Sequence, residues 1–150
     1  MPAASDLYQE QILDHYKHPK NKGPLPGATF SARDTNPLCG DEVAFHLKVD
    51  RSQRVSDVRF EGRGCAISQA SASMLTEAVA GKSLQEAEGL ADRFRGMMEG
   101  KVEPEEESFG DLVALRGVVK YPVRIKCAVL AWDVLQEALG GAGRAAEASH

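Results

Sequence analysis

Apolar and polar residues alternate in the first half of the chain, which is the pattern of β-strands. Every second residue from Val43 to Val49 is apolar and most of the others are polar, as in a strand with one buried face. A further strand is predicted over Val55–Phe60, after a polar turn, and a short one over Phe30–Thr35. These segments predict a small antiparallel sheet of about three strands.

Helical spacing of apolar residues is found on either side of these strands. The prolines and glycines of Pro19–Pro26 end the first helix, and Ser83 with Glu86 forms a capping box at the start of another. An exposed acidic loop is predicted over Lys101–Gly110. Helices are predicted over Leu7–His18, Ala66–Ala80, the segment after Ser83, a short stretch near Asp111–Leu115, and Val123–Leu139 up to a stop at Gly140.

Strands early and helices late indicate an α+β fold in which the sheet packs against the helices. A chain of 150 residues is long enough to bury such a core as one domain. We therefore predict a single domain over residues 1–140 and a flexible C-terminal tail over 141–150, whose residues are small and polar.

Composition and charge narrow the class of protein. Apolar residues at 43% and charged residues at 27% are typical of a globular protein. A net charge of −4 argues against broad nucleic-acid binding, and no apolar run approaches the roughly 20 residues that cross a bilayer. The N-terminus lacks a signal-peptide pattern, and an odd count of three cysteines does not suit a disulfide framework. We therefore expect a cytoplasmic protein with neither nucleic acid nor membrane as its partner.

Three cysteines and one aspartate carry the candidate chemistry. Cys39 and Asp41 lie two residues apart in a Pro/Gly-flanked turn, Cys65 lies at a predicted helix start, and Cys127 lies in the last helix. Three thiolates and a carboxylate make the four ligands of a tetrahedral zinc site. A cysteine taken alone is also typical of a small buried hydrophobe, which suits Cys127 better than Cys39. Taken together, the four residues favour a shared metal site.

The charges near this site bear on its chemistry. The amides and dipole of a helix N-terminus favour the thiolate of Cys65. Formal counting leaves a net charge of about −2 around a divalent cation. Arg63, Arg124 and Lys126 lie beside the ligands in sequence and are candidates to offset that charge, although solvated surface is an equal explanation for Lys126.

Histidines and serines are not expected to compete for this role. Solvated surface is the expected place of all the histidines, so Asp41 is the better fourth ligand. The serine run from Ser68 to Ser73 lies on a helix without a partnered base, so a serine nucleophile is not expected. The four histidines are His15, His18, His46 and His150.

Three motifs give the chain a resemblance to a known family. They are Asn-Pro-x-Cys-Gly-Asp around Cys39, Gly-x-Gly-Cys-Ala-Ile-Ser-x-Ala-Ser-Ala-Ser from Gly62, and Lys-Cys-Ala at Cys127. In this order they resemble the IscU/NifU-like family of iron–sulfur cluster assembly proteins, over about Leu7–Leu139. The chain is more similar to the SufU branch than to the IscU scaffolds, for three reasons. Lys126 replaces a histidine of the scaffolds, Lys120–Arg124 replaces their Leu-Pro-Pro-Val-Lys motif, and the stretch between the second and third cysteines is longer.

The resemblance implies an IscU/SufU-like fold and a role in sulfur transfer. It implies zinc held by Cys39, Asp41, Cys65 and Cys127, and a zinc-dependent sulfurtransferase that takes persulfide sulfur onto Cys39 from a SufS-type cysteine desulfurase. The sulfur then passes to a downstream SufBCD-type iron–sulfur scaffold complex. Arg124 matches a family arginine that works with the desulfurase, so Cys39 and Arg124 are the expected catalytic residues.

Two other functions remain open from the sequence. The same ligands suit iron or a [2Fe-2S] cluster, which makes a scaffold for cluster assembly and transfer the alternative. A purely structural zinc in an adaptor domain is a third possibility, although an aspartate ligand is unusual there.

For sulfur transfer, we expect the carboxylate of Asp41 to be the weakly held ligand that keeps the site adjustable.

Overall fold

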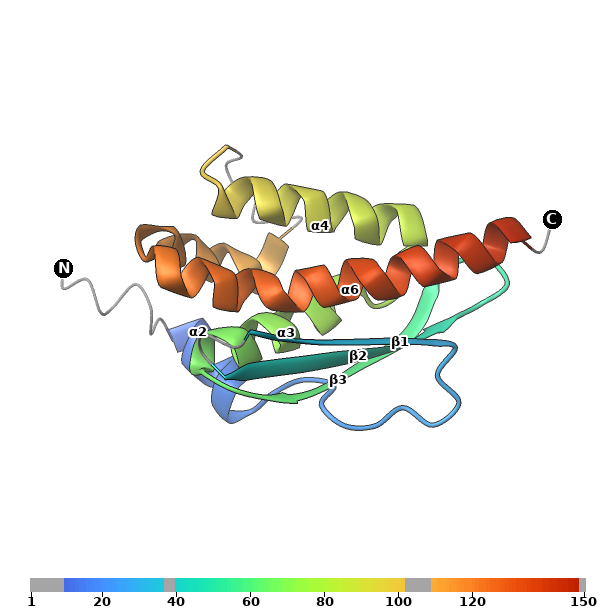
Figure 1. Ribbon diagram of the computed structural model, residues 1–150, viewed down its shortest axis with the longest axis horizontal. Coiled ribbons are helices and arrows are strands. Elements are labelled where there is room, and N and C mark those ends of the chain that lie inside the picture. Colours follow the sequence, from blue (N-terminus) through green and yellow to red (C-terminus); the bar gives the residue numbers. More distant parts are fainter. Residues whose placement is uncertain (1–9, 37–39, 102–108, 149–150) are drawn as a thin grey trace.

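The computed structural model describes residues 10–36, 40–101 and 109–148, with side chains as far as Gly141 (Figure 1). It therefore omits Cys39 and most of the loop predicted over Lys101–Gly110. The elements, in chain order, are α2 (Glu10–Lys17), β1 (Phe30–Asn36), β2 (Asp41–Val49), β3 (Val55–Arg63), α3 (Ala66–Val79), α4 (Leu84–Met98), the 3-10 helix η1 (Gly110–Lys120) and α6 (Pro122–Ala148).

The predicted antiparallel sheet is confirmed, with strand order β1-β2-β3. Side chains of β2 point alternately to the two faces of the sheet. Val43, Phe45 and Leu47 on one face are fully buried, whereas His46 and Lys48 on the other are partly exposed. In this register Asn36 pairs with Asp41, so both residues lie at one end of the sheet.

Helices cover one face of the sheet in two layers (Figure 1). The long α6 lies along the strands, α3 lies beside it against β3, and α4 packs on the side of α6 away from the sheet. Trp132 of α6 is fully buried and its ring centroid lies 4.4 Å from that of Phe94 on α4. This ring contact joins the outer helix to the inner layer.

Small side chains allow α3 to be buried on nearly every side. Alanines and serines fill half of its positions, and Ala70, Ser71, Ala72 and Ser73 are all inaccessible to solvent. The next helix starts as predicted, because Ser83 and Glu86 form a complete capping box.

Two helical predictions need correction. The short helix near Asp111–Leu115 is a longer 3-10 helix, η1. The stop at Gly140 is wrong, because α6 continues through Gly140 and Gly141 to Ala148. A glycine inside a helix costs only about 1 kcal/mol, and the alanine-rich sequence that follows favours helix. The boundary at residue 140 therefore coincides with no break in the helix, and the flexibility of the tail stays a prediction.

Within the described part of the chain, no helix has the combined length and hydropathy of a membrane-spanning segment.

Candidate metal centre

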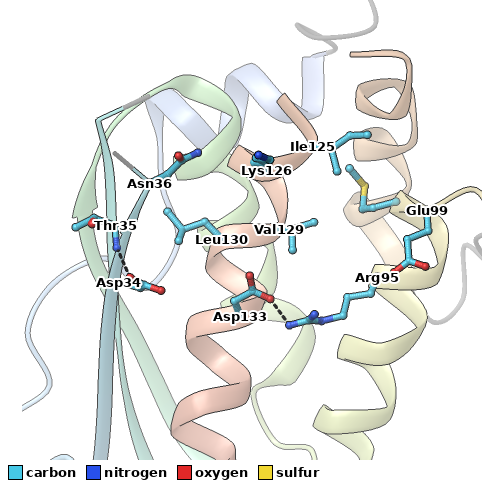
Figure 2. A pocket seen from close by; sticks show the side chains of 11 residues that line it. Asp34, Thr35, Asn36, Arg95, Glu99, Ile125, Lys126, Val129, Leu130 and Asp133 are labelled. Carbon is cyan, nitrogen blue, oxygen red and sulfur yellow. Dashed lines mark hydrogen bonds and ion pairs between the residues drawn. The ribbon is translucent and has the colours of Figure 1, made fainter. Parts of the chain in front are cut away.

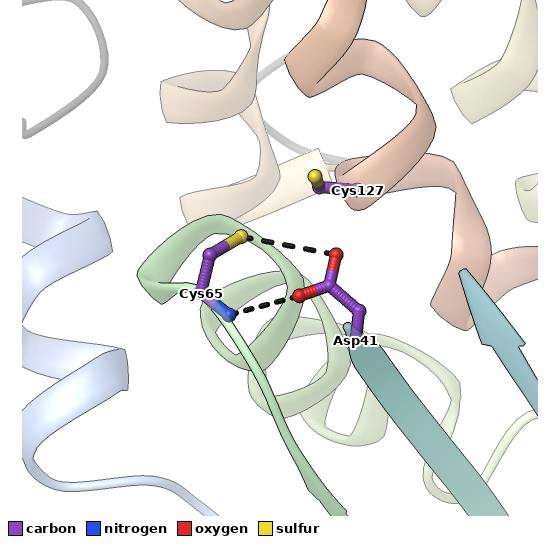
Figure 3. Close-up of side chains that lie close together, drawn as sticks. All are labelled: Asp41, Cys65 and Cys127. Carbon is purple, nitrogen blue, oxygen red and sulfur yellow. Dashed lines mark hydrogen bonds between the residues drawn. The ribbon is translucent and has the colours of Figure 1, made fainter. Parts of the chain in front are cut away.

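Asp41, Cys65 and Cys127 come together from three elements and are called the metal centre below (Figure 3). Asp41 opens β2, Cys65 precedes α3, and Cys127 lies in the second turn of α6. One ligand atom of each lies within 4.8 Å of the others. Three of the four expected ligands, separated by up to 86 positions in sequence, are thus brought together by the fold.

Asp41 points into the protein because it shares the parity of Val43 and Phe45 along β2. It is only 1% exposed. The backbone N–H of Cys65 donates to its Oδ1 at 2.9 Å, and the hydroxyl of Ser68 donates to the same oxygen at 3.1 Å. The other oxygen, Oδ2, lies 3.9 Å from the Sγ of Cys65 (Figure 3).

Cys65 is the N-cap of α3, as its place before the alanine-rich helix predicted. Its backbone is extended, and its Sγ accepts a hydrogen bond from the backbone N–H of Ser68 at 3.5 Å. A Cβ on the preceding Gly64 would lie 2.2 Å from Asp41 Oδ1, so only glycine lets the chain pass this close to the carboxylate.

Cys127 is fully buried on the face of α6 that packs on α3 and the sheet. Pro122 occupies the first helical position, as predicted. The hydroxyl of Ser71 on α3 donates to the carbonyl of Ala128 at 2.7 Å. This bond fixes α3 against α6 one residue after the third cysteine.

Cys39 lies outside the described residues, but the turn that follows it is described. Gly40 has a φ of +70° and its N–H donates to the carbonyl of Asn36 at 2.9 Å. Gly40 thus has a left-handed backbone, which glycine adopts without steric cost. The turn directs Asp41 into the metal centre, and Cys39 is bonded to Gly40 in the chain.

The donor set fits zinc. Bond lengths of about 2.3 Å to sulfur and about 2.0 Å to oxygen place two tetrahedral ligands roughly 3.5 Å apart. The 3.9 Å between Cys65 Sγ and Asp41 Oδ2 is close to that separation. Because Oδ1 already accepts two hydrogen bonds, Oδ2 is the oxygen that faces the thiols.

Arg63 is less involved in the metal centre than its sequence position indicated. The Arg63 side chain is 86% exposed and its Nε lies 3.5 Å from Glu42 Oε2. Lys126 is exposed, and Arg124 is half-buried. Arg63 thus pairs with a surface carboxylate on β2.

A hollow of about 410 Å³ lies beside the metal centre, between β1, α4 and α6 (Figure 2). Asn36 and Lys126 line its end nearest to the ligands, and an ion pair between Arg95 and Asp133 lies further along. Burial raises the pKa of Asp133 above its usual value, the Arg95 charge opposes this shift, and Asp34 adds to it. The hollow gives solvent access next to the helix turn that bears Cys127.

A second polar group, called the His15 junction below, was not predicted. His15 is 1% exposed, so its assignment to the surface was wrong. Its Nδ1 lies 2.8 Å from Ser73 Oγ, and its Nε2 lies 2.9 Å from Asp111 Oδ2 and 3.5 Å from Glu77 Oε1. Ser73 therefore does have a partnered base, contrary to expectation, yet it is fully buried and no substrate reaches it.

The other described histidines differ from His15. His18 is exposed, as predicted. His46 is partly buried on the outer face of the sheet, 2.8 Å from both Ser31 Oγ and Glu61 Oε1. A signal for His15 was available, because it lies three residues after buried Ile12 on the same helix face.

Comparison with known proteins agrees with the motifs. Residues 7–128 match the NifU-like N terminal domain. The chain is 45% identical over 131 residues to the zinc-dependent sulfurtransferase SufU of Bacillus subtilis, which covers 87% of this chain and 88% of that protein. It is 43% identical over 144 residues to the iron–sulfur cluster assembly scaffold protein IscU of Streptococcus pyogenes, with 96% and 87% covered.

A solved structure is similar as well. The crystal structure of a putative iron–sulfur cluster assembly scaffold protein for the SUF system from Fervidobacterium islandicum superposes with a TM-score of 0.83 at 38% identity. The match covers 91% of this chain and 98% of that one. With the family match spanning most of its length, the chain belongs to the NifU-like N-terminal domain family, which includes the IscU and SufU proteins.

Proposed function

We propose that this protein is a zinc-dependent sulfurtransferase that accepts sulfur from a cysteine desulfurase on Cys39 and passes it on for iron–sulfur cluster assembly. The observation that carries the proposal is the convergence of Asp41, Cys65 and Cys127 from three elements. The zinc-dependent sulfurtransferase SufU of Bacillus subtilis, at 45% identity, supports the same assignment.

The proposed transfer conserves atoms and electrons. The thiolate of Cys39 attacks the outer sulfur of the desulfurase persulfide, a sulfur–sulfur bond forms on Cys39, and the bond within the desulfurase persulfide breaks. The desulfurase cysteine leaves as a thiolate, as in thiol–disulfide exchange. Zinc, which has no redox chemistry, supplies a centre that holds thiolates without oxidising them.

The chain's own residues have separate roles in this proposal. Cys65, Asp41 and Cys127 remain as ligands while Cys39 accepts sulfur. Arg124, one turn before Cys127 on α6, is proposed to contact the desulfurase. We place the protein in the cytoplasm with that partner, and a SufBCD-type complex is the proposed recipient of the sulfur.

A scaffold for [2Fe-2S] assembly is the second candidate, favoured by the 43% identity to the Streptococcus pyogenes IscU protein. Thiolates and a carboxylate also suit an iron–sulfur cluster. The position before Cys127 is an exposed lysine, which adds no further ligand to such a cluster.

Desulfurase turnover with and without the zinc-loaded protein tests the proposal. Stimulation that is lost in Cys39→Ala, together with a sulfur adduct on Cys39 by mass spectrometry, is the expected result. Lys126→Ala is the matched control, since it alters a surface residue beside the same centre. No stimulation by the intact protein, combined with transfer of a reconstituted cluster to an apo-acceptor, would establish the scaffold function instead.

A further inference from the structure

We infer that Ser68 is a positioning residue that holds Asp41 as a fixed, single-oxygen ligand, so that Asp41 is not the ligand that leaves the metal. The inference rests on the metal site of the proposed function. It concerns a residue that contacts two members of the metal centre and is itself fully buried.

The proton of the Ser68 hydroxyl has one favoured acceptor. Ser68 Oγ lies 3.1 Å from both Asp41 Oδ1 and the carbonyl oxygen of Cys65. The Cys65 carbonyl already accepts the N–H of Gln69 at 3.2 Å. The side-chain amide of Gln69 donates to Ser68 Oγ at 3.3 Å. A carboxylate is the stronger acceptor, so the hydroxyl proton goes to Asp41.

The two oxygens of Asp41 therefore have different tasks. Oδ1 accepts from the Cys65 amide and from the Ser68 hydroxyl, and Oδ2 faces the Cys65 thiol. If the carboxylate rotated to bind the metal through both oxygens, or to leave it, both hydrogen bonds to Oδ1 would break, and their buried donors would lose their partner. Gly64 adds a steric limit, because its backbone lies close against Oδ1.

Ser68 also acts on the second ligand. Its backbone N–H donates to Cys65 Sγ at 3.5 Å, so one residue at the start of α3 orients both the carboxylate and a thiol. This revises the expectation that a weakly held Asp41 keeps the site adjustable. The carboxylate is a weak ligand by chemistry, but the fold holds it in place, which leaves ligand exchange to the thiol of Cys39.

Zinc affinity measured by competition with a chromophoric chelator tests the inference. Ser68→Ala is expected to weaken zinc binding roughly 10- to 100-fold, the usual range for a residue that orients a metal ligand. Ser73→Ala is the matched control, because Ser73 is equally buried on the same helix and its hydroxyl contacts His15 rather than Asp41. Its expected loss is below about 3-fold.

An isosteric pair separates the hydroxyl from packing if Ser68→Ala folds poorly. Threonine and valine side chains have the same shape and differ in the hydroxyl group. The Ser68→Thr variant should therefore bind zinc at least about 10-fold more tightly than the Ser68→Val variant. When Asp41→Ala is also present, the two variants should have equal zinc affinity. Cobalt loaded in place of zinc should show weaker visible absorption in Ser68→Val, as Asp41 gains freedom to offer both oxygens.

The outcomes are distinct. Equal affinity of the threonine and valine variants, or the same difference between them without Asp41, would overturn the role of Ser68 and leave sulfur transfer untouched. Zinc binding that follows the expected order, with desulfurase stimulation absent, would support the role of Ser68 while the proposed function fails.

Discussion

The metal centre and the His15 junction are both groups of metal-ligating residue types, and each is held where three elements meet on α3. They differ in how the protein satisfies their polar atoms. Both nitrogens of His15 lie within 2.9 Å of a hydroxyl or carboxylate oxygen, and Ser73 also accepts the N–H of Lys20. In the metal centre, the short hydrogen bonds go to one oxygen of Asp41, and the contacts of the Cys65 thiol are 3.5 Å or longer.

This difference separates a structural polar group from a ligand set. Buried polar atoms are nearly always hydrogen-bonded, and the His15 junction meets that requirement with the protein's own groups. The carboxylates of Glu77 and Asp111 are also about half exposed, so water completes them. In the metal centre, by contrast, the thiols and Oδ2 lie close to one another, and a bound cation would be their shared partner.

The largest expected effect is loss of a ligand. Cys65→Ala should weaken zinc binding more than about 100-fold, beyond the range for residues that only orient ligands. Zinc at about 1,000 times its Kd stabilises the native protein by ~4 kcal/mol, so chelation should lower the Tm of the unaltered protein by roughly 10 °C. Chelation should leave the Tm of Cys65→Ala unchanged, and an equal fall in both proteins would contradict a metal at this centre.

Gly64→Ala should come next in effect. The added Cβ meets Asp41 Oδ1 at 2.2 Å, which displaces the carboxylate and should weaken zinc binding roughly 10- to 100-fold. Gly89→Ala is the control, because a Cβ there meets open space on an exposed helix face. Unchanged zinc affinity in Gly64→Ala, measured by chelator competition, would mean that the position of Asp41 does not matter.

His15→Gln tests the other side of the comparison. It should lower the free energy of unfolding by about 2–3 kcal/mol, because Ser73 and Asp111 lose a buried partner. Urea unfolding of the zinc-free protein measures this loss. Zinc affinity should stay within about 3-fold of the unaltered protein, so a larger change would show that the two groups are coupled through α3.

The smallest expected effect distinguishes two similar histidines. Asp111→Asn should cost about 1 kcal/mol of stability, because its oxygen holds a buried imidazole in place. Glu61→Gln, beside the partly exposed His46, should cost about 0.5 kcal/mol or less, since water replaces the lost contact. Elemental analysis should find the same zinc content in both variants, and a lower content in Asp111→Asn would make the His15 junction a metal site.

The sequence predicts what depends on local pattern. The alternation of apolar and polar residues along β2 predicted the sheet. Because Asp41 lies two residues before Val43, its side chain points inward as that of Val43 does. Cys65 was placed at a helix start because the alanine-rich segment begins directly after it. These inferences need only neighbouring residues, which is why they hold.

Contacts between distant segments were not predictable in the same way. Ser73 and Asp111 are 58 and 96 residues from His15, so no local pattern pairs them. The spacing from Ile12 is only a weak signal for the burial of His15, because Tyr16 lies at a similar spacing on α2 and is 46% exposed. The role of Ser68 was hidden for the same reason, since its acceptor lies 27 residues earlier on a strand.

The contact between Trp132 and Phe94 gives the molecule a built-in optical probe. Trp132 is the only tryptophan in the sequence, so all indole emission from the protein originates at this one point. It lies five residues after Cys127 on the same helix, about 7.5 Å along the axis. Its emission therefore reports the environment of the helix that carries the third cysteine, and titrations can be followed in the unlabelled protein.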